Sequence, residues 1–246
     1  MNRIVAIGAL VLIGYGVSAQ NSETRKLSSF DEVSVSQGIE VYLSEGSEEK
    51  ARIEIDGNID LDEVLTDVNG GTLKIHLDGN NYRNVDVQVY VTYKRLEGLR
   101  ASSAGSIEVK DDVECDCSFD IDVSSAGEVE VTVKADEIEM EASSAGDIDA
   151  RVFANDLEAS VSSAGDIDIS GKVREIEVTA SSSGDFSGYD LVSEEADLRA
   201  SSGGSIKVTV TKDIKARASS GGSINYKGNP EYSDKESSSG GSVRRN

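Results

Sequence analysis

The chain has 246 residues, with 24 Lys and Arg against 46 Asp and Glu, and its formal net charge is −22. A charge this negative repels polyanions and acidic lipid surfaces, which argues against nucleic-acid binding through a phosphate-neutralising surface. Apolar residues make up 37% of the chain and aromatic residues 5%, too little for a thick globular core.

The N-terminal segment, from Met1 to Ala19, has the pattern of a secretory signal peptide. Met1 to Arg3 form a short positive start, residues 4–17 are uncharged and mostly apolar, and Val17-Ser18-Ala19 resembles a cleavage site. A 14-residue helix covers about 21 Å, which is short for a membrane anchor. We expect residues 1–19 to be removed and the mature chain to be exported, to the periplasm, the outer membrane or the exterior, without a remaining transmembrane segment.

A four-residue motif, Ser-Ser-x-Gly, recurs eight times in the C-terminal part of the chain. The copies begin at positions 102, 124, 143, 162, 181, 201, 219 and 238, so the intervals between successive starts differ little from one another. Apolar residues recur at steps of two around each copy, which is the period of a strand. Five residues after each first serine lie Ile107, Val129, Ile148, Ile167, Phe186, Ile206, Ile224 and Val243.

A repeat of about 19 residues cannot bury its apolar face alone, so the repeats must stack and share one core. Stacked equivalent strands are parallel, and crossovers between parallel strands are right-handed. We therefore predict an all-β fold, a right-handed parallel β-helix or solenoid. The periods of six and nine residues that define two rival repeat folds are absent.

The glycine that ends each motif is expected to supply a positive φ at a tight corner and to let successive corners stack. The stacked corners then account for the 36 serines and 24 glycines without invoking disorder. The predicted structural glycines are Gly105, Gly127, Gly146, Gly165, Gly184, Gly204, Gly222 and Gly241.

Residues 20–98 lack this motif but keep the alternation of strands, with turns such as Asp56-Gly57-Asn58 and Asn69-Gly70-Gly71. We predict that they form an N-terminal all-β part that caps the solenoid, and that residues 99–246 form the repeat β-helix. The pattern leaves open whether the N-terminal part is a separate sheet or irregular coils. Pro230 and the polar tail to Asn246 favour capping over open stacking, while a homo-oligomer stays possible.

The two cysteines, Cys115 and Cys117, are two residues apart. Such residues on one strand point the same way about 6.5 to 7 Å apart, at the limit of disulfide geometry. Because Phe119, Ile121 and Val123 continue the alternation, we interpret both cysteines as small core residues with free thiols. Metal binding and an intermolecular bridge are the alternatives.

Several segments resemble a known family. They are Phe30-Asp31-Glu32-Val33-Ser34-Val35, Gln37-Gly38-Ile39-Glu40-Val41-Tyr42-Leu43, Asn69-Gly70-Gly71-Thr72-Leu73-Lys74-Ile75 and the eight Ser/Gly turns. With these, the chain from about Leu27 to Asn246 resembles the auto-transporter adhesin family with the head GIN domain, known from secreted Bacteroidetes-type proteins. The resemblance implies a pectin-lyase-like β-helix that lacks the catalytic residues of those enzymes, and a role in cell adhesion.

Catalytic chemistry finds little support in the sequence. The one histidine, His76, lies between Ile75 and Leu77 on a predicted strand, and no G-x-S-x-G turn presents a nucleophile. Carboxylate pairs recur at the same position of successive repeats, as Glu128 and Glu130, Asp147 and Asp149, and Asp166 and Asp168, whereas a catalytic pair should occur once. We predict no enzyme; a polysaccharide-active enzyme and a purely structural spacer are the alternatives to an adhesin-like module.

One position of the repeat carries Glu128, Asp147, Asp166 and Asp185, which we call the acidic column. Stacked about 4.8 Å apart, these carboxylates would repel one another, and weak Ca²⁺ binding is the one cofactor hypothesis they support. Residues 20–198 carry a net charge of −28 and residues 199–246 a net charge of +5. We expect an unidentified surface glycan or protein as partner, and no nucleic acid.

Exposed aromatic residues would favour a glycan, because sugar-binding surfaces commonly use them. The candidates are Tyr82, Tyr90 and Tyr93 in the N-terminal part and Tyr226 and Tyr232 near the C-terminus. If these tyrosines are buried, glycan binding loses this support.

Overall fold

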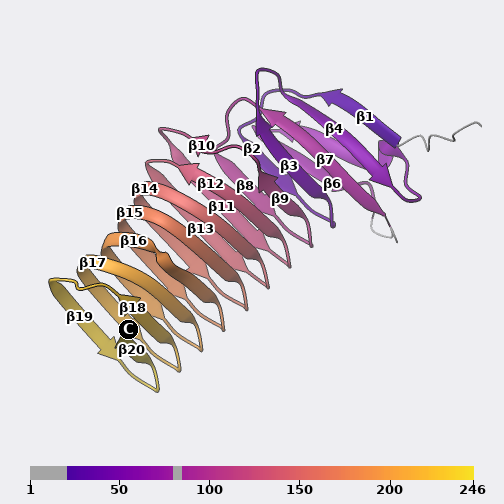
Figure 1. Cartoon of the computed structure of the whole chain (residues 1–246). Helices are drawn as coiled ribbons and strands as arrows, with labels where there is room; N and C mark the ends of the chain where they lie inside the picture. Colours follow the sequence, from indigo (N-terminus) through magenta and orange to yellow (C-terminus); the bar gives the residue numbers. More distant parts are fainter. Residues whose placement is uncertain (1–20, 80–84) are drawn as a thin grey trace, which may run out of the picture.

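The computed structural model describes residues 21–79 and 85–246, which form an elongated stack of strands (Figure 1). The predicted signal peptide, residues 1–19, and Tyr82 lie outside the described residues. Within them, twenty strands pair into one continuous system, and η1 (Leu61–Glu63) is the only helical element. In the part of the chain so described, no helix combines the length and the apolar character that a membrane crossing requires.

The strands of the N-terminal part are β1 (Asn21–Lys26), β2 (Glu32–Val35), β3 (Glu40–Glu45), β4 (Lys50–Asp56), β5 (Val64–Asn69), β6 (Thr72–Leu77) and β7 (Asp86–Tyr93). The repeats begin with β8 (Gly98–Ala101), β9 (Ser106–Val109), β10 (Val113–Glu114), β11 (Ser118–Ser124), β12 (Glu128–Lys134) and β13 (Glu137–Ser143). They continue with β14 (Asp147–Val161), β15 (Asp166–Ala180), β16 (Asp185–Ala200), β17 (Ser205–Ala218), β18 (Ser223–Lys227), β19 (Tyr232–Ser237) and β20 (Ser242–Arg245).

The repeats stack as parallel coils, one coil for each repeat, which confirms the predicted β-helix and its coil length. The first half of each coil pairs within one sheet and the second half within another. For instance, Ile148 lies opposite Ile167 in the first sheet and Ala159 lies opposite Val178 in the second. The predicted inward column is continuous, because each member is the register partner of the next: Ile107, Val129, Ile148, Ile167, Phe186, Ile206, Ile224 and Val243.

Each Ser-Ser-x-Gly motif forms a two-residue turn of the type I′ pattern. Its two central residues have positive φ, from 48° to 64° at Ser or Ala and from 77° to 80° at Gly203, Gly221 and Gly240. The fourth residue donates its N–H to the carbonyl of the first serine at 2.8–2.9 Å in all eight copies. Stacked corners are further joined by bonds such as Ala145 N–H to Ser163 O at 3.2 Å.

The expected role of the eight motif glycines is corrected by this geometry. None of them has a positive φ; the strained conformation falls on the two residues before each of them. Glycine is required for a different reason, because the coil before it passes very close. A Cβ on Gly127 or Gly146 would lie 2.5 Å from the backbone oxygen of Ala101 or Val123.

The N-terminal part contains both regular coil and antiparallel sheet. Strands β2 and β3 stack in register on β8 and β9, with Val33 opposite Leu99 and Val41 opposite Ile107. Their corner at Gln37 and Gly38 has φ values of 63° and 71°, and the repeat motif does not predict this corner because its sequence lacks the Ser-Ser-x-Gly pattern. Beyond this coil, β1 with β4, β4 with β7, and β5 with β6 are antiparallel. A division of the chain at residue 98 stays a prediction.

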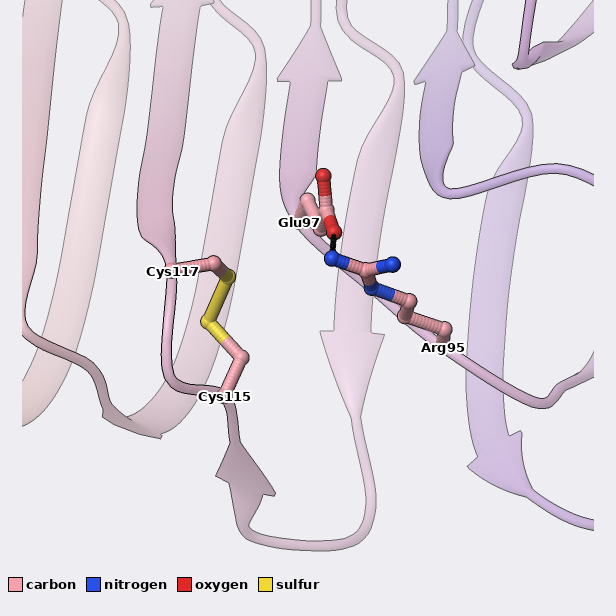
Figure 2. The surroundings of a disulfide bond; sticks show 4 residues. All are labelled: Arg95, Glu97, Cys115 and Cys117. Carbon is pink, nitrogen blue, oxygen red and sulfur yellow. Dashed lines mark ion pairs between the residues drawn. A yellow bond between two sulfur atoms is a disulfide. The ribbon is translucent and has the colours of Figure 1, made fainter.

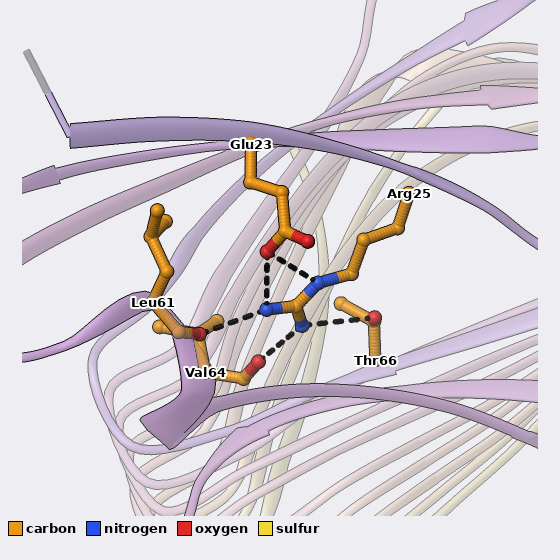
Figure 3. A network of polar contacts seen from close by, with 5 residues as sticks. All are labelled: Glu23, Arg25, Leu61, Val64 and Thr66. Carbon is orange, nitrogen blue, oxygen red and sulfur yellow. Dashed lines mark hydrogen bonds and ion pairs between the residues drawn. The ribbon is translucent and has the colours of Figure 1, made fainter.

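Arg25 ties the two sheets together at the N-terminal end (Figure 3). From β1, its guanidinium donates to the carbonyl oxygens of Val64 at 2.5 Å and Leu61 at 2.8 Å, and to Thr66 Oγ1 at 3.3 Å. Glu23 on the same strand accepts from it at 2.8 Å. One side chain therefore satisfies backbone groups of η1 and β5 that lie at the end of the stack.

The two cysteines form a disulfide, so the prediction of free thiols was wrong (Figure 2). Cys115 and Cys117 lie in a bend between β10 and β11, and their Cα atoms are 5.2 Å apart. The spacing of about 6.5 to 7 Å applied to an extended strand, whereas the bend shortens it into the range of a disulfide. This bend belongs to the longest of the intervals between successive motifs, the one from Ser102 to Ser124.

The last coil, formed by β19 and β20, places polar residues at inward positions. Lys235 occupies the position of Ala216 in the coil before it, and Arg245 that of Tyr226. Lys235 Nζ donates to the Tyr226 hydroxyl at 3.1 Å. Inward charges of this kind make a coil edge unfavourable for further stacking, which supports the capping role expected of this segment.

Candidate functional site

The acidic column lies on the outer face of the first sheet, and the structure brings its four members into direct register. Glu128 lies opposite Asp147, Asp147 opposite Asp166, and Asp166 opposite Asp185. A second acidic line runs beside it two residues further along each strand, through Glu108, Glu130, Asp149 and Asp168. The column ends where Asp185 meets Ser205 and where Lys207 Nζ lies 3.2 Å from the Asp185 carboxylate.

Crowding of like charges perturbs the middle of the acidic column. Partial burial, and then the carboxylates of Asp149 and Asp168, raise the pKa of Asp147. For Asp166, partial burial raises the pKa first, followed by the charges of Asp185 and Asp147, while Lys207 opposes the shift. Ionising these two groups therefore costs folding free energy, which a bound cation would relieve.

Divalent-cation binding by the acidic column stays a prediction. Across residues 21–79 and 85–246, no cluster of three or more histidine, cysteine or carboxylate side chains has the arrangement to hold a metal ion. Parallel columns present their carboxylates side by side and do not surround a point, as Ca²⁺ coordination by six to eight oxygens requires. Unfolding with EDTA and then with added CaCl₂ tests the prediction, because an unchanged midpoint contradicts it.

The outer face of the second sheet carries a separate row of acidic residues, which the sequence analysis did not predict. Asp120, Glu139, Glu158, Glu177 and Asp197 are register partners on its outer face, and Lys215 follows them. Each of these acids stands four positions before a Ser-Ser-x-Gly motif, so the repeat spacing contained the signal. Both broad faces of the solenoid are therefore strongly anionic over most of its length.

Two tyrosines stack on the N-terminal half of the first sheet, but their ring faces are already in use. The Tyr42 and Tyr90 ring centroids are 5.2 Å apart, and the rings are nearly parallel. The Arg52 guanidinium lies 4.4 Å from the Tyr90 centroid, and Lys110 Nζ lies 4.8 Å from the Tyr42 centroid. A hydrogen bond to Glu40, followed by partial burial, raises the pKa of Tyr42 to about 12.

The tyrosines that were expected to offer a sugar-binding surface divide unequally. Tyr93 and Tyr226 are buried, and Tyr90 belongs to the stack just described. Burial raises the pKa of Tyr93 to about 12. Tyr232 on β19 is exposed over 57% of its surface. Of the described candidates, only Tyr232 keeps the role that the sequence suggested.

The histidine and the paired carboxylates do not converge on a reaction centre. His76 is partly exposed on β6, where its Nδ1 lies 3.3 Å from the Leu77 carbonyl oxygen. The pairs Asp147 and Asp149, and Asp166 and Asp168, occupy equivalent places on successive coils. Their surroundings repeat with the coil, and a catalytic acid and base need surroundings that differ.

A groove of about 550 Å³ lies beside the corners of the last four coils. Its lining includes Arg199 and Arg217 from the strands and Ser201, Ser219 and Ser238 from the corners. Both arginines are engaged: Arg199 pairs with Glu177 and with Asp197, and Arg217 lies 3.7 Å from Asp234 and 3.5 Å from Glu236. The groove can offer hydrogen bonds to a polar ligand, but its cations are neutralised.

Comparison with known proteins agrees with this architecture. Residues 29–230 match the family model described as "Putative auto-transporter adhesin, head GIN domain". A putative adhesin from Parabacteroides merdae covers 94% of the chain and 98% of its own, at 18% identity and a TM-score of 0.84. A putative adhesin from Parabacteroides distasonis covers the same shares at 19% identity and a TM-score of 0.85.

A third structure, called a putative lipid binding protein, also comes from Parabacteroides distasonis. It covers 92% of the chain and 97% of its own, at 26% identity and a TM-score of 0.77. No curated protein matches the chain in sequence.

Proposed function

The chain belongs to the auto-transporter adhesin family with the head GIN domain, and on that premise we propose that it is an exported, non-catalytic adhesin-type module. Its role is to bind a glycan or a protein at a cell surface. The family's description implies an exported or surface protein, which agrees with the signal-peptide pattern of residues 1–19.

The observation that carries this proposal is the regular repetition of outward side chains. Glu128, Asp147 and Asp166 stand in line on one broad face, and Glu139, Glu158 and Glu177 do so on the other. Repeated groups at about 4.8 Å suit a ligand that contacts several coils at once. Many weak contacts of this kind add up through effective concentration, which is how an adhesin gains avidity.

The same repetition disfavours a polysaccharide-cleaving enzyme. Two catalytic carboxylates must differ in protonation, one as acid and one as base or nucleophile. Partial burial and neighbouring carboxylates raise the pKa of both Asp147 and Asp166, and two shifts in the same direction do not separate the pair into an acid and a base. The geometry therefore favours binding without turnover.

Binding and cleavage can be measured on the same sample. Labelled protein comprising residues 20–246 would be titrated onto whole bacterial cells and onto their isolated surface polysaccharide, while released reducing ends and unsaturated uronates are recorded. We expect saturable binding without product. Product formation would establish the enzyme, and the absence of saturable binding to cells and polysaccharide would contradict the adhesin role. Heat-unfolded protein controls for charge alone, because unfolding leaves the net charge of the sequence unchanged.

A further inference from the structure

A narrow third side of the solenoid, where each coil passes from the first sheet to the second, differs from the two acidic faces. The first outward position there is occupied by Lys134, Phe153, Lys172 and Val192 on successive coils, each the register partner of the next. A groove of about 380 Å³ lies over this side, and its lining includes Lys134, Phe153, Asn155, Lys172 and Arg174. Four successive coils build this groove together, since Glu194 from β16 completes its lining.

Apolar surface is concentrated on this side. Phe153 is exposed over 37% of its surface and Val192 over 38%, and within the described residues Tyr232 is the other large apolar side chain as exposed as these. The Arg151 guanidinium lies 5.5 Å from the Phe153 ring centroid. Single exposed apolar residues are ordinary on a protein surface. Phe153 differs because its ring forms part of the wall of a groove that also contains cations.

The three cations of the groove differ in the number of ion pairs that they make. Lys172 makes no ion pair with any described residue, although its charge, after that of Lys212, lowers the pKa of Glu194. Lys134 lies 3.6 Å from Glu114, with both side chains largely exposed. Arg174 is held by Asp156 and by Glu175. Lys172 is therefore the cation with the least competition for an incoming anion.

Two carboxylates also line the groove and limit what it can hold. Glu194 accepts from Lys212 Nζ at 2.6 Å, so its charge is neutralised, while Asp136 is exposed. Three cations and two acids leave the lining with a charge near +1 in a protein of −22. One ligand carboxylate can be accommodated, but a long polyanion would meet the acidic faces on both sides.

We propose that the groove beside Phe153 binds the terminal acidic sugar of a glycan, an inference that rests on the proposed adhesin-type function. The apolar face of the sugar ring stacks on Phe153, and its carboxylate binds Lys172 Nζ, one coil or about 4.8 Å along the column. Asn155 offers an amide to the sugar hydroxyls. Water is excluded from one side of the ring, which makes the Lys172 contact stronger than a fully exposed ion pair.

The test uses protein comprising residues 20–246 and two matched probes, an oligosaccharide ending in glucuronate and the same oligosaccharide ending in glucose. We expect the glucuronate probe to bind at least about tenfold more tightly. Phe153→Ala should weaken that binding about tenfold, and Lys172→Gln should remove the preference over the glucose probe. Lys215→Gln is the matched control for Lys172→Gln, because Lys215 is also an exposed lysine but lies away from the groove.

The outcomes separate this inference from the function on which it rests. Equal binding of the two probes, or Phe153→Ala binding like the native chain with an unchanged unfolding midpoint, overturns the inference. Binding that occurs only to phosphatidylglycerol vesicles, and not to the glucuronate probe, also overturns it. If the glucuronate probe fails but the protein still binds whole cells, the groove assignment is wrong and the adhesin role stands. If neither binds, the proposed function fails with it.

Discussion

Gly146 faces the backbone of Val123 so closely that an added Cβ would lie 2.5 Å from the Val123 carbonyl oxygen. Its neighbour Ala145 is exposed and has a φ of 61°, a conformation that costs an L-residue about 1 kcal/mol. Two adjacent small residues therefore have opposite requirements. Position 146 has no room for a side chain, whereas position 145 has room for one but requires a backbone with positive φ.

Gly146→Ala should lower the free energy of unfolding by at least about 2 kcal/mol, because the adjacent coil must shift. Ala145→Gly, its matched control, should be neutral or should stabilise by up to about 1 kcal/mol, since released strain exceeds the added chain entropy. Urea unfolding followed by circular dichroism measures both. Equal destabilisation by the two variants would contradict the assignment of strain and of close approach.

Asp166→Asn should stabilise the protein at pH 7.5 by about 0.5 kcal/mol, because it removes one charge from the acidic column. The raised pKa means that the folded protein holds the Asp166 proton more tightly than the unfolded chain does. The destabilisation is therefore complete above the raised pKa and disappears as the pH falls towards about 3.9, the unfolded value. The gain from Asp166→Asn should vanish at pH 3.5.

Asp185→Asn is the control for this prediction, because Asp185 belongs to the same column but has Lys207 Nζ 3.2 Å away. Removing a paired carboxylate should not stabilise the protein at pH 7.5. Urea midpoints at the two pH values compare the variants. A gain for Asp185→Asn equal to that for Asp166→Asn would show that the repulsion is not local.

Reduction of the Cys115–Cys117 disulfide should cost about 1.5 kcal/mol, since the loop that it closes is very short. For a chain of this length that corresponds to a fall of about 3–6 °C in Tm. Mass spectrometry after iodoacetamide treatment should show no alkylation before reduction and two alkylated thiols after it. Alkylation of the untreated protein would contradict the disulfide, and Cys115→Ser with Cys117→Ser should reproduce the Tm of the reduced protein.

Arg25→Met should destabilise the N-terminal end by about 2 kcal/mol, because the carbonyl groups of Leu61 and Val64 lose a charged donor. Hydrogen exchange should quicken in β1 and β5 before it does in the central coils. Lys26→Met, at the neighbouring position, removes the same charge without those bonds and should leave exchange unchanged. Uniform quickening through the whole stack would argue against a local cap.

The spacing of the repeats alone predicts part of the candidate surfaces, namely the columns of carboxylates. The regular repeat determines which carboxylates share a column, so the sequence alone predicts that Asp147 and Asp166 are neighbours, as the register shows. The groove at Phe153 was not predictable, because it depends on how the passage from one sheet to the next is shaped. The column that contains Phe153 reads Lys134, Phe153, Lys172 and Val192 on successive coils, and such a mixture of charged and apolar residues gives no periodic signal.

The sequence by itself determined the stacked parallel β-helix, its coil length and the inward column from Ile107 to Val243, because side-chain alternation and repeat spacing are local properties that stacking preserves. Only the tertiary structure decided where the corner strain falls, that Cys115 and Cys117 are joined, and that Arg25 closes the N-terminal end. Each of these depends on distances between residues in separate coils or in an irregular bend. Such distances are set by packing, and a linear pattern does not contain them.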